Sequence, residues 1–133
     1  MNKIKRIFAS LMVAATVGAV SISAAAYSNP SYSLNISYKS YAWSAAAVKE
    51  DTSNSAAVHS TGGNVSSTKP VYVTIYSDTR IGNVDRVSGT ILLTSNSQDK
   101  TITYTDTVSQ NKSYYILGET GAYSATVSGY WNP

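Results

Sequence analysis

Few residues of this chain have side chains suited to catalysis. His59 is the only histidine and there is no cysteine, so a thiolate nucleophile and a metal centre with several histidine ligands are both excluded. A Ser–His–Asp triad would need His59 as its base, and no G-x-S-x-G motif occurs. Glycoside hydrolysis needs two carboxylates, but Glu50 and Asp51 are adjacent and would point to opposite sides of a strand. We therefore predict that His59 is an ordinary strand or surface residue and that the protein is not an enzyme.

Residues 77–88 are predicted to form a loop or a short hairpin whose side chains could hold a cation. Asp78, Asn83 and Asp85 offer oxygen ligands of the kind that calcium takes in proteins. The spacing of an EF-hand is absent, and Asp beside a turn commonly bonds the local backbone instead. We predict no metal and no cofactor, although calcium binding by the Asp78–Asp85 loop stays open. The same loop should carry solvated ion pairs, made with Arg80 and Arg86.

Tyrosine is the most informative residue type. All eleven tyrosines follow residue 26, and several alternate with Ser and Thr, as on the polar face of a sheet. An aromatic strip on such a face can stack on sugar rings or hold a partner protein. Alternatively, cross-strand Tyr–Thr pairs only stabilise the sheet. The predicted binding residues are Tyr72, Tyr76, Tyr114 and Tyr130. Three others fall on apolar faces, namely Tyr38, Tyr104 and Tyr123.

The first 26 residues have the pattern of a secretory signal peptide. A short basic segment, residues 1–6, precedes an uncharged apolar segment, residues 7–22, and Ala24 to Ala26 supply the small residues of a cleavage site. A membrane anchor would need about 18 or more apolar residues. We predict cleavage after Ala26 and a secreted, extracellular protein.

Charge and cysteine content restrict the partners of the secreted part. Three of the ten basic residues, Lys3, Lys5 and Arg6, lie in the signal peptide, so the remaining seven balance the seven acidic residues. Without a basic excess, nucleic acid is not an expected partner. The absence of cysteine rules out disulfides and a lipoprotein anchor, and no apolar C-terminal tail suggests another anchor. We expect the mature form not to be embedded in a membrane.

The remaining sequence is typical of β-structure, because Ser, Thr, Tyr and Val dominate. Residues 32–38 and 71–76 alternate apolar and polar side chains. Further strands are predicted at 89–94, 101–108, 113–117 and 122–131, connected as an antiparallel meander, whereas residues 42–69 give a weaker pattern. The prediction is a signal peptide, 1–26, followed by one all-β domain, 27–133, an antiparallel β-sandwich of about seven strands with an Ig-like or jelly-roll-like topology.

The apolar side of each strand predicts the core. In the last strand Trp131 should point inward and Tyr130 outward, so removal of residues 131–133 is expected to lower the melting temperature. The predicted core comprises Leu34, Ile36, Trp43, Val71, Val73, Ile75, Ile91, Leu93, Ile102, Tyr104, Leu117, Val127 and Trp131.

Three segments carry a resemblance to known proteins. KEDTSNSAAV (49–58), VYVTIY (71–76) and VSGYWNP (127–133), together with the signal peptide, resemble small exported proteins of Gram-positive bacteria, whose families are mainly of unknown function. A weaker similarity is to lactococcin 972-like bacteriocins, which are also small, secreted, cysteine-free and rich in aromatic residues. SYAW (40–43) lacks the histidine of the SxYxH pattern of that family, so the resemblance implies no site residue.

Three functions remain, none of them enzymatic. The first is a secreted module that contacts the cell wall, a glycan or another protein through its tyrosines. The second is a bacteriocin-like antagonist, which should stop the growth of related strains. The third is a matrix protein that assembles edge to edge, since charge-poor strands such as residues 101–108 can pair between molecules. Light scattering at high concentration would test the third.

Overall fold

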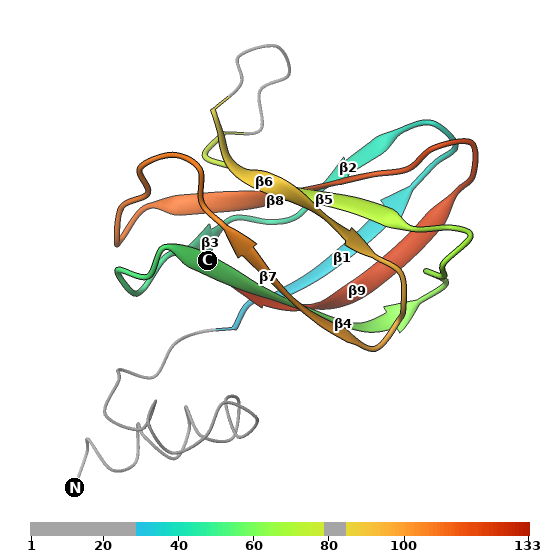
Figure 1. Ribbon diagram of the computed structural model, residues 1–133, viewed down its shortest axis with the longest axis horizontal. Coiled ribbons are helices and arrows are strands. Elements are labelled where there is room, and N and C mark those ends of the chain that lie inside the picture. Colours follow the sequence, from blue (N-terminus) through green and yellow to red (C-terminus); the bar gives the residue numbers. More distant parts are fainter. Residues whose placement is uncertain (1–28, 79–84) are drawn as a thin grey trace, which may run out of the picture.

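The computed structural model describes residues 29–78 and 85–133, and these fold into two antiparallel β-sheets packed face to face (Figure 1). The predicted signal peptide, its cleavage site after Ala26, and the loop residues Arg80 and Asn83 lie outside the described residues. The all-β sandwich is confirmed. Within the described ranges no helix is long and apolar enough to cross a bilayer.

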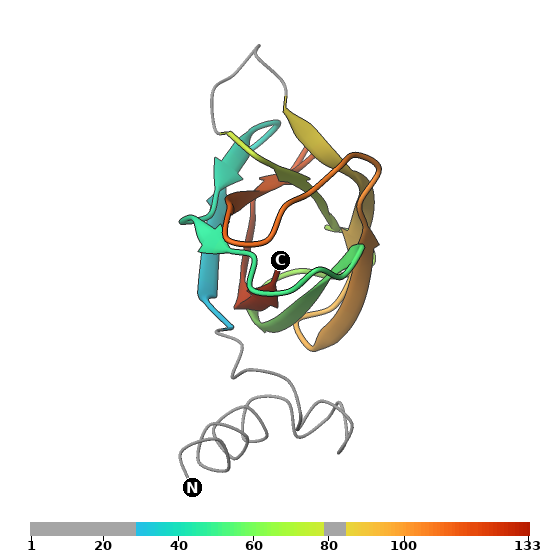
Figure 2. The same cartoon turned by 90° about the vertical axis from the view of Figure 1, so that its left-hand side faces the viewer.

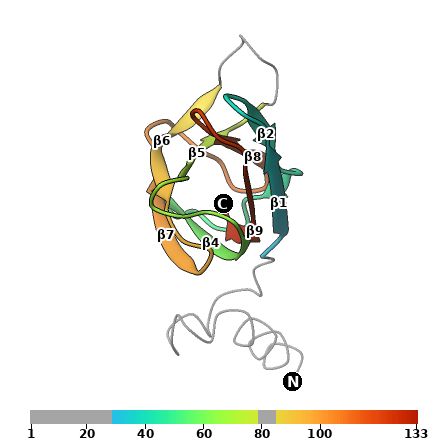
Figure 3. The ribbon, with the colours of Figure 1, turned by 90° about the vertical axis from the view of Figure 1, so that its right-hand side faces the viewer.

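The described residues form nine strands, two more than expected. They are β1 (Ser31–Ile36), β2 (Tyr41–Trp43), β3 (Ala47–Val48), β4 (Ser55–Gly63), β5 (Val71–Tyr76), β6 (Arg86–Leu93), β7 (Gln98–Thr103), β8 (Ser113–Glu119) and β9 (Ala125–Asn132). One sheet has the order β1-β9-β4-β7; the other has the order β2-β8-β5-β6, with β3 also paired to β8. Figure 3 shows β2, β8, β5 and β6 along one side and β7, β4 and β9 along the other.

The predicted C-terminal meander is wrong. Strands β6, β7, β8 and β9 alternate between the two sheets, so each connection crosses from one sheet to the other. Their hydrogen-bonded neighbours come from distant segments: β9 lies between β1 and β4, and β8 lies between β2 and β5. The alternation of side chains identifies a strand but not its partner, which explains the error.

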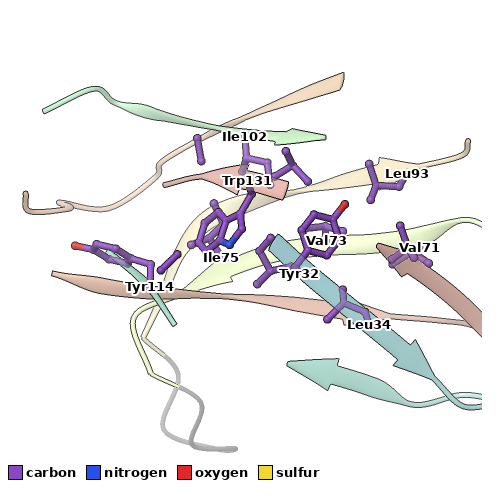
Figure 4. Packing of buried hydrophobic residues seen from close by; sticks show 14 of the residues in the cluster. Tyr32, Leu34, Val71, Val73, Ile75, Leu93, Ile102, Tyr114 and Trp131 are labelled. Carbon is purple, nitrogen blue, oxygen red and sulfur yellow. The ribbon is translucent and has the colours of Figure 1, made fainter. Parts of the chain in front are cut away.

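The inner faces of both sheets form the core. Figure 4 shows Trp131 of β9 among core residues of both sheets, with Ile102 and Ile75 nearby. Every predicted core residue is buried or packed against the core except Trp43, which is half-buried on the outer face. Leu117 is buried but also points outward, since its neighbour Ile116 faces the core.

Two further expectations differ from the structure. Tyr38 is predicted to lie on an apolar face, but this residue is 59% exposed. The reason is that β1 ends at Ile36 and the chain turns through Lys39, whose φ is 49°. The weak pattern of residues 42–69 contains the nine-residue β4. This strand is irregular in register between Ser60 and Gly62. At Gly63, φ is 118° and a Cβ would lie 2.1 Å from the oxygen of Thr126, so only glycine fits there.

Candidate functional site

The outer face of the five-stranded sheet gathers aromatic side chains from strands far apart in the sequence. In β5 the side chains of Val71, Val73 and Ile75 fill the core, so Tyr72 and Tyr76 point outward. The cross-strand register places outward residues of β2 and β8 beside them. We call this surface the aromatic face, and it consists of Tyr41, Trp43, Tyr72, Tyr76, Leu92, Tyr115 and Glu119.

One row of the aromatic face crosses four strands. Tyr41 lies opposite Glu119, Glu119 opposite Tyr72, and Tyr72 opposite Leu92. The side chains of Tyr41, Tyr72 and Leu92 are 44%, 41% and 37% exposed. Because β8 separates β2 from β5, the backbones of the two tyrosines are roughly 9.5 Å apart, twice the usual strand spacing. Glu119 therefore lies on the strand between two exposed tyrosines, on the same face of the sheet.

The other aromatic residues form a more closely packed group. The rings of Trp43 and Tyr76 meet edge to face, with centroids 5.2 Å apart, and Tyr76 lies opposite Tyr115. Thr74 points outward between these rows but is buried, so its neighbours on this face cover it. Its hydroxyl lies 2.7 Å from that of Thr90, to which the Nη2 of Arg86 donates a hydrogen bond at 3.1 Å.

The structure brings together only two of the four predicted binding residues. Tyr72 and Tyr76 lie on the aromatic face. Tyr114 does not face solvent as predicted: it is 4% exposed, and its hydroxyl accepts a hydrogen bond from the backbone N–H of Ser109 at 2.8 Å. Its neighbour Tyr115 takes the outward position, because Ile116 and Gly118 of the same strand face the core.

Tyr130 lies on the opposite sheet. Its ring stacks on the imidazole of His59, with centroids 4.5 Å apart and planes at 21°. The Nδ1 of His59 lies 2.5 Å from a carboxylate oxygen of Asp99, and these residues border a hollow of about 200 Å³. Tyr130 points outward, as predicted, but is only partly exposed and separate from the aromatic face.

Tyr41 and Trp43 were not predicted from the sequence as binding residues. They alternate around Ala42, a signal of period two, but β2 has only three residues and lies in the segment with the weak pattern. Its partner strand β8 is more than 70 residues away in the sequence, as in the pair Trp43 and Leu117. Nothing local predicts that these side chains share a face with Tyr72.

The acidic residues form no cluster suited to a metal ion in the described part of the chain. No group of three or more His, Cys, Asp or Glu is placed to hold a metal ion among residues 29–78 and 85–133. Asp51 forms an ion pair with Lys49, and Asp85 is exposed. The predicted calcium loop includes Asn83, which lies outside the described residues. Arg86 donates to the oxygen of Ser88 and to Thr90.

Comparison with known proteins adds no relative: no family model, no curated protein and no solved structure matches this chain.

Proposed function

We propose that this protein is a secreted, non-enzymatic glycan-binding module and that the aromatic face is its binding surface. The observation that carries the proposal is the exposed row Tyr41–Glu119–Tyr72, beside the ring pair of Trp43 and Tyr76. The C–H faces of a pyranose pack on aromatic rings, and its hydroxyls donate to carboxylates and exchange hydrogen bonds with hydroxyls. The aromatic face offers both kinds of contact on a single sheet.

The geometry favours a glycan over a partner protein. The cores of protein interfaces are depleted of charged residues, whereas Glu119 stands in the middle of the exposed row. The separation of Tyr41 and Tyr72, roughly 9.5 Å between backbones, is close to the length of two sugar residues in an extended 1,4-linked chain. One sugar residue could then stack on each tyrosine, with Glu119 accepting from hydroxyls between them. A cell-wall polysaccharide of this linkage is the favoured ligand.

The other two functions receive less support. Of residues 101–108, proposed above for edge-to-edge assembly, only Thr101 to Thr103 belong to β7. The end of that strand lies beside β6, where Ser88 and Tyr104 form an isolated bridge, so this edge is less open than a flat sheet edge. A bacteriocin-like antagonist would need a surface that recognises its target, and none of the surfaces described above indicates such a target.

Replacing Tyr41 and Tyr72 by serine should reduce glycan binding without unfolding the protein. Each exposed ring contributes through stacking, so each single variant should bind peptidoglycan or chitin about 10-fold more weakly, a loss of roughly 1.4 kcal/mol, and the double variant should not bind measurably. Melting temperatures should stay within a few degrees of the parent because both side chains are exposed. Pull-down on the insoluble polymers measures the binding, and circular dichroism measures the melting.

Tyr130→Ser provides the matched control, because it makes the same change on the opposite sheet. It should leave glycan binding unchanged. Full binding by the double variant, or an equal loss in Tyr130→Ser, would contradict the proposal. A loss of melting temperature without a change in binding would mean that the tyrosines only stabilise the sheet.

A further inference from the structure

A polar cleft of about 450 Å³ lies between residues 52–54, which lead into β4, and residues 104–108, which follow β7. Figure 2 looks onto this end of the sandwich, where both segments come close to the end marked C. The volume is in the range of small-molecule sites, about 300–1,000 Å³. The cleft is separate from the aromatic face, whose residues do not line it.

The cleft is lined mainly by hydroxyl groups. Ser53 and Thr105 are among several Ser and Thr residues on its walls, Asn54 adds an amide, and Val108 adds an apolar contact. Asp106 is exposed, and its Oδ1 accepts from the backbone N–H of Thr107 at 2.8 Å. Among the described residues that line it, none is basic. These groups match a neutral ligand with many hydroxyls and repel an anion.

Tyr104 supplies the observation that points to a ligand. It lines the cleft and is 4% exposed, and its hydroxyl is shielded from solvent without a hydrogen-bond partner. Leaving such a group unpaired lowers the stability of the folded protein. Among the buried side-chain oxygens and nitrogens of the described residues, only Asn132 Oδ1 shares this condition. Burial, with smaller effects of Tyr114 and Asp51, raises the pKa of the Tyr104 phenol, so it remains a protonated donor.

The wall beside Tyr104 is held by a buried ammonium group. The Nζ of Lys49 lies 5.0 Å from the centre of the Tyr104 ring. It donates to Asp51 Oδ1 at 2.7 Å, to Ser53 Oγ at 3.2 Å and to the main-chain oxygen of Pro133 at 3.1 Å. Because an ammonium has three donors, none remains for a ligand. Lys49 therefore fixes residues 51–53 and leaves recognition to the side chains of the cleft.

We propose that this cleft binds a single neutral sugar residue, with the hydroxyl of Tyr104 donating to one of its oxygens. Because that hydroxyl is shielded from solvent in the free protein, the proposal requires the wall of the cleft to move when the sugar binds. Binding then gives the hydroxyl an acceptor that it lacks in the free protein. The free energy that the free protein loses by leaving this donor unpaired is recovered in the complex, and this strengthens binding. The site does not depend on the aromatic face and is tested separately from it.

The first arm of the test compares two Tyr→Phe variants by thermal unfolding without ligand. Tyr104→Phe should leave the melting temperature unchanged or raise it, because it removes a hydroxyl that has no partner. Tyr114→Phe is the matched control: its ring lies 6.2 Å from that of Tyr104, but its hydroxyl is bonded to Ser109. It should lower the melting temperature by several degrees. A comparable loss in Tyr104→Phe would overturn the proposal.

The second arm measures binding of N-acetylglucosamine, glucose and glucuronate at millimolar concentrations, by the amide resonances of residues 52–54 and 105–108. At least one neutral sugar should shift these resonances, and glucuronate should not. Tyr104→Phe should weaken binding of the neutral sugar about 10-fold. Tyr41→Ser should not affect the binding measured at these resonances. The proposal is wrong if no neutral sugar binds, if glucuronate binds equally well, or if Tyr104→Phe binds like the parent.

Discussion

Replacing Trp131 by alanine is expected to lower the free energy of unfolding by about 3–5 kcal/mol. The indole is fully buried on β9, between core side chains of both sheets (Figure 4). Its removal leaves a cavity that the close-packed neighbours fill only in part. For a domain of about 100 residues this loss corresponds to a fall in melting temperature of more than about 10 °C, measured by circular dichroism.

The second tryptophan of the chain is the matched control. Trp43 is half-buried on the outer face, so Trp43→Ala should cost clearly less than Trp131→Ala. Trp131→Phe should recover part of the lost stability, because a phenyl ring refills part of the cavity. If the two alanine variants were equally stable, Trp131 would not be the main contact that fixes the last strand in the core.

The sequence predicted the fold class well, because alternation in a strand directly reflects which side is buried. In β1 the side chains of Tyr32, Leu34 and Ile36 are all buried while those between them are exposed. The same pattern identified β5 and the inward position of Trp131. The topology could not be predicted in the same way, because strand pairing depends on contacts between distant segments.

The candidate site was only partly predictable for the same reason. Tyr72 alternates with Val71 and Val73, so its outward direction follows from the local pattern. In β8 the segment Tyr114–Leu117 is continuously apolar, and period two cannot decide which of two adjacent tyrosines points inward. The register against β5, with Gly118 facing Leu34 and Ile36, decides it.

Nothing in the sequence predicted the buried environment of Lys49. A lysine followed by Glu and Asp is expected on a solvated surface, yet its side chain is completely buried. The three oxygens around it come from Asp51, Ser53 and the distant Pro133. Only the folded chain brings the segment before β4 and the end of β9 to the same place.

Asp51→Ala is the second substitution with a large expected effect, a loss of about 3 kcal/mol or more. It leaves the ammonium of Lys49 buried without its counter-charge, which is far more costly than losing an exposed ion pair. Lys49→Met should cost less, because methionine fills similar space without a charge and Asp51 is partly accessible to water. Asp106→Ala, the removal of an exposed carboxylate, should change stability by less than about 0.5 kcal/mol. Urea unfolding measures all three, and equal losses for Asp51→Ala and Asp106→Ala would contradict this role of Lys49.

The same ion pair gives the stability a defined dependence on pH. Burial alone would raise the pKa of the Asp51 carboxyl, but hydrogen bonds from Lys49 and Ser53 outweigh it and hold the pKa below its ordinary value of 3.8. A carboxyl whose pKa is lower in the folded state stabilises the protein above its unfolded pKa, and this contribution is lost as the pH falls toward the folded pKa. The difference in stability between the parent and Asp51→Asn should therefore be constant from about pH 7 to pH 5 and should shrink below about pH 4. A difference that stayed the same down to pH 2 would show that the charge of Asp51 contributes nothing to holding Lys49 in the core.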